Sequence, residues 1–306
     1  MSGYLAACIL SAVSSIYTYP TGENNEIHVS HYGAALFGQP NTITGEKVSE
    51  WASESSQVNP EELGEYLEGD ILVPAEKGGR NGLLDFSSKW DGGMVPYVIV
   101  GPYNTDEQEV IHNAIKQYHD NTCIRFRRKQ PDDRDYIKIV NTRTGCWSSV
   151  GKIGGAQEVN LQSPGCLSTV GTPVHELMHA LGFHHEQTRY ERDDFVDILW
   201  SNIKKGHEGN FAKVPKDAAT GFGVKYDYGS VMHYSAHAFS VNTQPTIVPK
   251  DKDVKIGQRD GFSVGDIIKI RNMYNCTKMD DNSHSKPTGS SSLVSGLNSF
   301  INNLIG

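Results

Sequence analysis

The sequence is that of an α+β fold, and two kinds of local pattern agree with this fold class. Residues 97–100 and 136–140 are rich in aromatic and β-branched side chains, which favour strands. The segment that begins at Thr105 carries Asp106 and Glu107 in its first turn, and an apolar stripe at helical spacing follows. The stripe consists of Val110, Ile111, Ala114, Ile115 and Tyr118. Strands and an amphipathic helix are therefore both expected.

Length and composition narrow the class of protein. The chain has 306 residues, of which 37% are hydrophobic and 21% charged, so it can bury a sizeable core. No apolar run reaches the roughly 18 residues that a membrane-spanning helix needs. The formal net charge of -8 gives no bulk attraction to phosphate backbones. We therefore expect a globular protein with no membrane span and no nucleic-acid partner.

The first 15 residues predict a secretory signal peptide. They carry no charged side chain, and the apolar run 5–10 is followed by small residues from Ser11 onward. A short buried segment is the alternative. Secretion into the extracellular space is the expectation.

The cysteines agree with this expectation. Cys8 falls inside the predicted signal, and four cysteines remain, which allow three pairings. They are Cys123, Cys146, Cys166 and Cys276. An even set favours disulfide bonds in an oxidising compartment, whereas four free thiols would be the cytosolic alternative.

Residues 16–80 form a separate acidic block. They hold eleven acidic and three basic side chains, a net charge of -8, so the rest of the chain is close to neutral. Their thin apolar pattern predicts an extended segment without a core of its own, ending in the turn-rich stretch 76–82. A solvated linker is one interpretation. A propeptide that a trypsin-like protease cuts after Arg80, leaving Asn81 as the new N-terminus, is the other.

The C-terminal residues 278–306 change character twice. A polar, Ser-rich linker is followed by apolar residues at helical spacing, which predict a short amphipathic helix. Its apolar positions are Leu293, Val294, Leu297, Phe300, Ile301, Leu304 and Ile305. This stripe lacks the Lys and Arg of membrane-surface helices, so docking onto the body or onto a partner is expected.

Eleven residues carry the chemistry. From His175 to His185 the chain spells H-E-x-x-H-x-x-G-x-x-H. We expect Thr172 to cap a helix that carries His175 and His179 on one face, where two imidazoles can share one metal ion. Pro173 suits the first helical position.

The other positions of the motif complete a zinc site. Glu176 lies too close to the first ligand to bind the same ion easily, but it can act as general base toward a zinc-bound water. Gly182 can adopt a left-handed conformation that ends the helix and returns His185 to the metal as third ligand. His184 is adjacent, but the spacing selects His185. The prediction is one Zn²⁺ per chain with an open position.

Beyond this motif the sequence resembles the astacin family of zinc endopeptidases, within the metzincin clan. Glu186 directly after the third histidine is typical of that family. Segments 145–151, 156–157 and 165–166 match it upstream, and 229–234, 256–259, 263–267 and 274–276 match it downstream. The resemblance covers 81–277, about the size of one astacin catalytic domain.

The resemblance implies roles for further residues. Met232 would lie as an apolar floor under the zinc site. Tyr234 would be a further zinc ligand that swings away to stabilise the oxyanion. The cysteines would pair as Cys123 with Cys276 and Cys146 with Cys166.

It also implies latency. The stretch 67–70 resembles the family's propeptide motif, with Leu67 where the family usually has Phe, and Asp70 would cap the zinc. After cleavage at Arg80, the new N-terminal segment would turn inward toward Glu186.

The implied architecture is a twisted, mostly parallel sheet with two long helices above an active-site cleft and an irregular lower subdomain. The implied function is that of a secreted, latent zinc endopeptidase, a monomer that acts on proteins or peptides. An extended substrate would add a strand to the sheet edge near 147–152. Arg259 is either a basic group of the cleft or a structural arginine. A catalytically silent zinc-binding or adhesive module is the alternative function, and the presence of Glu176 argues against it.

Overall fold

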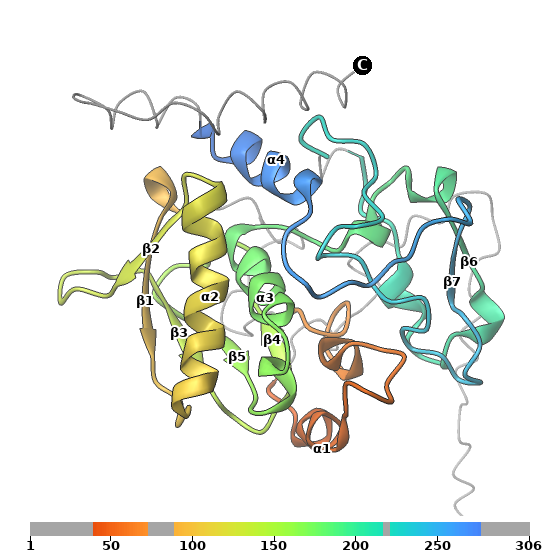
Figure 1. Ribbon diagram of the computed structural model, residues 1–306, viewed down its shortest axis with the longest axis horizontal. Helices are drawn as coiled ribbons and strands as arrows, with labels where there is room; N and C mark the ends of the chain where they lie inside the picture. The colour runs from red at the N-terminus through yellow and green to blue at the C-terminus, as the bar shows by residue number, and fades with distance from the viewer. Residues whose placement is uncertain (1–38, 73–88, 217–220, 277–306) are drawn as a thin grey trace, which may run out of the picture.

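A computed structural model describes residues 39–72, 89–216 and 221–276 (Figure 1). The expected signal peptide, the cleavage point at Arg80 and Asn81, and the C-terminal segment 278–306 all lie outside these ranges. Among the described residues, no helix is long and apolar enough to cross a membrane.

A five-stranded sheet forms the frame of the domain. Its strands are β1 (Met94–Ile99), β2 (Arg125–Arg128), β3 (Tyr136–Val140), β4 (Cys146–Ser148) and β5 (Ala156–Leu161), in the order β2-β1-β3-β5-β4. All neighbours are parallel except β4, which runs antiparallel to β5 at the edge. The mostly parallel sheet is therefore confirmed.

Two helices lie on this sheet (Figure 1). They are α2 (Thr105–Asn121) and α3 (Gly171–Leu181). The sequence stripe of α2 is the buried face, because Ile111, Ala114, Ile115 and Tyr118 are all buried. The Tyr118 hydroxyl donates to Val174 O at 2.7 Å, which fixes α2 against the helix that carries the HExxH motif.

The part of the domain that follows α3, which corresponds to the predicted lower subdomain, has little regular structure, as expected. It holds the two-stranded antiparallel sheet of β6 (Val196–Ile198) and β7 (Ile247–Pro249), packed on a separate apolar cluster around Phe211. Helix α4 (Val264–Met273) then returns to the main core. Short 3₁₀ turns occupy Asp91–Gly93, Gly165–Leu167, Glu186–Thr188, Arg192–Asp194, Trp200–Asn202 and Glu208–Phe211.

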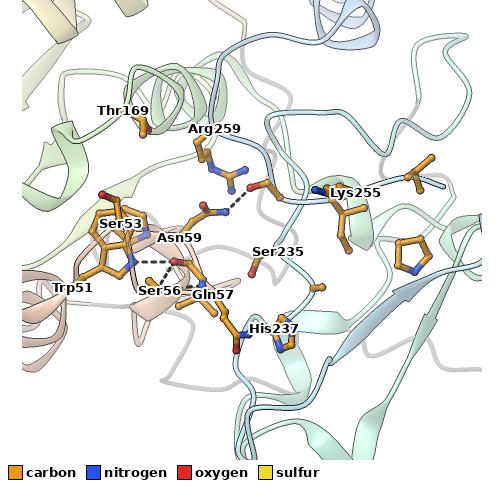
Figure 2. A pocket seen from close by; sticks show the side chains of 17 residues that line it. Trp51, Ser53, Ser56, Gln57, Asn59, Thr169, Ser235, His237, Lys255 and Arg259 are labelled. Carbon is orange, nitrogen blue, oxygen red and sulfur yellow. Dashed lines mark hydrogen bonds between the residues drawn. The ribbon is translucent and has the colours of Figure 1, made fainter. Parts of the chain in front are cut away.

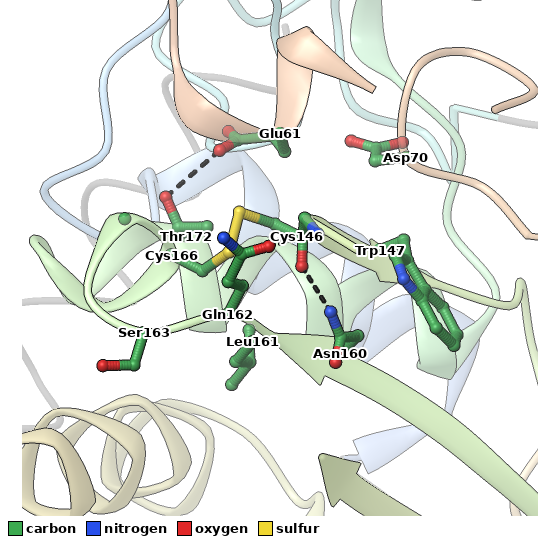
Figure 3. Close-up of a disulfide and its surroundings, with 12 residues drawn as sticks. Glu61, Asp70, Cys146, Trp147, Asn160, Leu161, Gln162, Ser163, Cys166 and Thr172 are labelled. Carbon is green, nitrogen blue, oxygen red and sulfur yellow. Dashed lines mark hydrogen bonds between the residues drawn. A yellow bond between two sulfur atoms is a disulfide. The ribbon is translucent and has the colours of Figure 1, made fainter. Parts of the chain in front are cut away.

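Both disulfide bonds that the resemblance implied are present in the structure. Cys123–Cys276 joins the start of β2 to the end of α4, and Cys146–Cys166 joins β4 to the loop before α3. Figure 3 shows the second bond beside Gln162 and Asn160. It holds the edge strand next to the segment that leads into α3.

The acidic segment differs from its prediction. Residues 42–50 are not extended but form α1 (Thr42–Glu50), which Asn41 caps by accepting from the backbone N–H groups of Ile43 and Thr44. A 3₁₀ helix follows at Pro60–Leu63. The helix shows little apolar pattern because it docks through one buried apolar side chain, Val48, and by close backbone approach: a Cβ on Gly45 would lie 2.0 Å from Arg143 O.

Two further boundaries were predicted wrongly. Thr172 does not cap α3, which begins at Gly171 after Val170; its hydroxyl instead donates to a carboxylate oxygen of Glu61 at 3.2 Å. Strand β1 begins at Met94 rather than Tyr97. Pro96 lies inside it, and proline is a poor strand signal because it lacks a backbone donor.

Candidate metal centre

Helix α3 presents two of the expected ligands on one face. His175 and His179 are four residues apart and fully buried, and their Nε2 atoms lie 3.1 Å from each other. Gly182 ends the helix with a φ of 114°, as expected, and its amide donates to the last carbonyl groups. This left-handed turn returns the chain so that the His185 ring faces both other histidines.

Asp70 completes the cluster from the acidic segment. One of its carboxylate oxygens lies 3.0 Å from His175 Nε2 and 3.1 Å from His185 Nε2, and the other lies 3.3 Å from His179 Nε2. Asp70 and the three histidines are all buried, and their ligand atoms lie within 4.8 Å of one another. The structure therefore brings together the three predicted ligands and the predicted cap.

These separations fit a zinc ion. Four ligands at about 2.0–2.1 Å in a tetrahedron lie about 3.3 Å from one another. The Asp70 carboxylate lies 3.0–3.3 Å from each of the three imidazole nitrogens, and the Nε2 atoms of His175 and His179 lie 3.1 Å apart. Their chemistry also suits the ion, since nitrogen and carboxylate oxygen are its ordinary ligands.

Glu176 gives an independent test of the fit. Within the described part of the chain, neither oxygen of its fully buried carboxylate has a hydrogen-bond partner. Burial, together with the negative charges of Asp70 and Glu61, raises its pKa well above the ordinary value. A buried carboxylate of this kind is costly unless a cation or a proton donor lies close to it. A divalent cation between the histidines would supply that charge.

The pKa of Asp70 is shifted in the direction opposite to that of Glu176. Burial by itself would raise its pKa, but the neighbouring rings of His185, His179 and His175 hold the pKa well below the ordinary value. The carboxylate is thus kept in the ionised form that binds a metal.

Tyr234 lies beside the histidine cluster, and its hydroxyl is hydrogen-bonded to the acidic segment. Its ring centroid is 4.6 Å from that of His185, and its hydroxyl donates to the backbone oxygen of Glu68 at 2.5 Å. Met232 is buried two residues before Tyr234, and the residue before Met232 contacts the cluster, because Val231 O lies 2.8 Å from His175 Nδ1.

Glu186 has partners of its own. Its carboxylate accepts from Lys269 Nζ at 2.5 Å, from Arg189 Nη1 at 2.9 Å and from the amide of Asp227 at 2.8 Å. The segment that was expected to reach Glu186 after cleavage lies outside the described residues. In this structure Glu186, which directly follows the third histidine, therefore joins α4 to the loop at Asp227.

The acidic segment follows the predicted substrate edge. Ser148 N donates to Asp70 O, and Leu72 N donates to Ser148 O, both at 2.9 Å. Ile71 and Ser148 form a parallel bridge, and the Ser149 hydroxyl donates to Leu72 O at 2.7 Å. The segment thus pairs with β4, at the edge where an extended substrate was expected.

Sequence reasoning missed the acidic residues that anchor this segment. Glu61 forms a buried ion pair with Arg259, and Glu62 accepts from the amide of Ser235 at 2.6 Å. Arg259 is therefore held by the acidic segment in this structure. The signal was present as Asn59-Pro60-Glu61-Glu62, which spells a capped helix start.

A cavity of about 780 Å³ lies between the acidic segment and the body. Figure 2 shows Trp51, Gln57 and Asn59 on one side and His237, Lys255 and Arg259 on the other. Asn59 bridges the two sides by donating to Gly257 O at 3.2 Å. The acidic segment is thus seated on the body through polar contacts.

The fold and the cluster define a class: a helix-borne HExxH site with a third histidine after a glycine turn, on a mostly parallel sheet. The chain belongs to the astacin family, peptidase family M12A, whose family model matches residues 83–275. The resemblance seen in the sequence is thereby confirmed.

Known proteins support the assignment. The chain is 48% identical over 197 residues to zinc metalloproteinase nas-13 of Caenorhabditis elegans, covering 64% of this chain and 43% of that protein. It is 39% identical over 229 residues to nas-4 of the same organism, covering 72% of each. The fold resembles high choriolytic enzyme 1, a hatching enzyme zinc-protease of the medaka fish Oryzias latipes, at 41% identity and a TM-score of 0.57. That match covers 62% of this chain and 94% of the hatching enzyme.

Proposed function

We propose that this protein is a secreted, zinc-dependent endopeptidase made in a latent form. The observation that carries the proposal is the convergence of three imidazole Nε2 atoms, together with the buried carboxylate of Glu176, which has no hydrogen-bond partner in the described part of the chain. His175, His179 and His185 would hold one zinc ion. When bound, the ion would act as a Lewis acid and lower the pKa of a water molecule.

Glu176 is suited to move protons. Because its oxygens have no hydrogen-bond partner among the described residues, the carboxylate is free to accept a proton from the attacking water. It would then pass this proton to the leaving amine.

Tyr234 would supply a second polar contact. Its hydroxyl now donates to the Glu68 backbone, so removal of the acidic segment frees a donor beside His185. We infer that it then serves as a further metal ligand and as a hydrogen-bond donor to the oxyanion of the transition state.

Substrate would bind where the acidic segment lies now. The backbone groups of Ser148 at the edge of the sheet would pair with an extended peptide, and main-chain bonds of this kind demand little of the substrate sequence. Proteins or peptides are therefore the proposed substrates.

Latency follows from Asp70, which takes the position that substrate and water need. We propose residues 1–15 as signal peptide, 16–80 as propeptide, 81–277 as the protease domain, and 278–306 as linker and amphipathic helix. A trypsin-like protease would cut after Arg80, and the segment beginning at Asn81 would move toward Glu186. The processed enzyme would act as an extracellular monomer.

The rival proposal is a zinc-binding or adhesive module without catalysis. Such a module has no chemical need for a base beside the metal, yet Glu176 is present, fully buried and close enough to the Asp70 carboxylate for the two charges to interact. Binding alone does not explain that side chain.

The decisive experiment follows casein cleavage by the secreted chain before and after mild trypsin, with zinc content measured each time. We expect activity only after processing. Glu176→Ala should retain zinc and lose at least about 100-fold in kcat/KM, because general-base catalysis contributes roughly 10²–10⁴-fold. Glu158→Ala, on β5, is the matched control. Zinc-loaded, processed wild type that cuts neither casein nor peptides would favour the binding module.

A further inference from the structure

The three histidines of the cluster differ in the hydrogen-bond partner of Nδ1, the ring nitrogen that points away from the cluster. His175 Nδ1 lies 2.8 Å from Val231 O, and His179 Nδ1 lies 2.7 Å from Phe183 O. His185 Nδ1 instead lies 2.7 Å from a carboxylate oxygen of Glu68. Two rings are therefore supported by the body of the domain, and the third is supported by the acidic segment.

This difference has chemical consequences. A histidine that binds a metal through Nε2 carries its proton on Nδ1, and the acceptor there fixes the tautomer and the ring orientation. A carboxylate is a stronger acceptor than a backbone carbonyl, because charge-assisted hydrogen bonds are roughly twice as strong as neutral ones. It also makes the ring a more basic ligand.

The Glu68 side chain is well fixed for this task. It is only 8% exposed, and its second carboxylate oxygen lies 3.3 Å from His184 Nδ1. Its backbone carbonyl accepts from the Tyr234 hydroxyl, and its φ of 48° belongs to a tight turn closed by Gly69 N donating to Tyr66 O. The turn places Glu68 and Asp70 at opposite edges of the same imidazole.

We propose that Glu68 is a removable positioning residue of the metal centre. It orients His185 and strengthens it as a ligand while the acidic segment is attached, and it leaves when that segment is cut away. The latent chain would then hold zinc more tightly than the processed enzyme, for a reason separate from the direct contact of Asp70 with the metal. This inference rests on the proposed zinc site and on the proposed cleavage.

The test measures zinc affinity of the full-length, uncut chain by competition with a chelator of known affinity. We expect Glu68→Ala to weaken zinc binding by about 10–100-fold, the usual cost of losing an outer-shell partner of a metal-bound histidine. Glu68→Gln keeps an acceptor and should recover part of the loss. Glu65→Ala is the matched control, since Glu65 belongs to the same segment but pairs with Lys47 and not with the cluster.

A second variant separates this role from that of Asp70. If Glu68 acts on His185 itself, Glu68→Ala should weaken zinc binding by a similar factor in an Asp70→Ala background. Adding Glu68→Ala should also change the visible spectrum of the Co²⁺-loaded Asp70→Ala chain. If Glu68 only holds Asp70 in place, the effect should vanish in that background, and the proposal is overturned.

Processing provides the folding control. Once residues 1–80 are removed, every Glu68 variant has the same covalent sequence, so each should show the wild-type kcat/KM. Wild type that binds zinc equally tightly before and after cutting would contradict the inference and leave the protease proposal intact. Wild type that binds no zinc would overturn the proposed function itself.

Discussion

At the scale of single residues, the position of a side chain in the site can depend on the conformation of one other residue. Gly182 is the clearest case, because its φ of 114° lies in a region that other residues avoid. The turn is what returns His185 to the two histidines on α3. Backbone strain introduced at Gly182 would therefore displace His185 from the cluster.

We predict that Gly182→Ala weakens zinc binding as well as stability. The added Cβ should cost about 1–2 kcal/mol in this conformation and displace His185. Zinc content after dialysis and the midpoint of urea unfolding measure the two effects. Gly206→Ala is the control, because Gly206 has a φ of 92° with open space around it and lies far from the cluster in sequence. It should lower stability without releasing zinc.

Tyr234 is the second residue whose role depends on a single atom. We predict that Tyr234→Phe lowers kcat of the processed enzyme about 100–1,000-fold with little change in KM, because the hydroxyl would stabilise the oxyanion in the transition state and would not contact the substrate before it. Steady-state kinetics on a peptide substrate measure this. Tyr103→Phe removes a buried hydroxyl that donates to Leu161 O, and it should affect stability more than kcat. Equal kcat for Tyr234→Phe and wild type would contradict the assigned role.

At the scale of elements, the segment 39–72 acts as a clamp with several contacts. Its Glu61 meets Thr172 of α3, its Asp70 meets the histidine cluster, and its Leu72 meets β4. Figure 3 shows Glu61 and Asp70 above the strand that carries Trp147. The contacts are spread along the segment, so no single one accounts for its docking.

The buried Glu61–Arg259 pair is the strongest test of this clamp. Removing one member of a buried pair leaves an uncompensated charge, which costs about 3–5 kcal/mol. We predict that Glu61→Ala lowers the melting temperature of the uncut chain and raises its residual activity before trypsin. Glu65→Ala removes partly exposed ion pairs with Lys47, Lys204 and His207 and should cost at most about 1 kcal/mol.

The melting temperature separates docking from folding. After trypsin has removed the segment, the Glu61→Ala and wild-type chains should melt alike, since they have the same sequence. A difference that persisted after cutting would show damage to the protease domain during folding.

At the scale of the whole molecule, two covalent links join parts that are distant in sequence. The Cys123–Cys276 bond spans 153 residues and encloses most of the described domain. A crosslink over a loop of this length restricts the unfolded chain strongly. It also fixes α4, which carries the Lys269 partner of Glu186, against the start of β2.

We predict that Cys123→Ala with Cys276→Ala lowers the free energy of unfolding of the processed enzyme by about 2–5 kcal/mol. Guanidinium unfolding at fixed zinc concentration measures the loss, because bound metal itself stabilises the folded state. Loss of Cys146–Cys166 should cost less in chain entropy, since it spans only 20 residues. It should instead raise KM, because it fixes the sheet edge proposed for substrate.

The sequence by itself determined which histidines form the cluster, the family and the kinds of element around them. The four-residue spacing of His175 and His179 places both on one helical face, and Gly182 permits the left-handed turn that leads to His185. Such local periodicities can be read along the chain because they involve neighbours within about ten residues.

Only the tertiary structure decided how the acidic segment is held. Its helix α1 docks through Val48 and by backbone approach at Gly45, which leaves no apolar stripe to detect. The contacts of Glu61 with Arg259 and of Glu68 with His185 join residues 198 and 117 positions apart. No local pattern encodes such pairs, because they arise only when distant parts of the chain pack against each other.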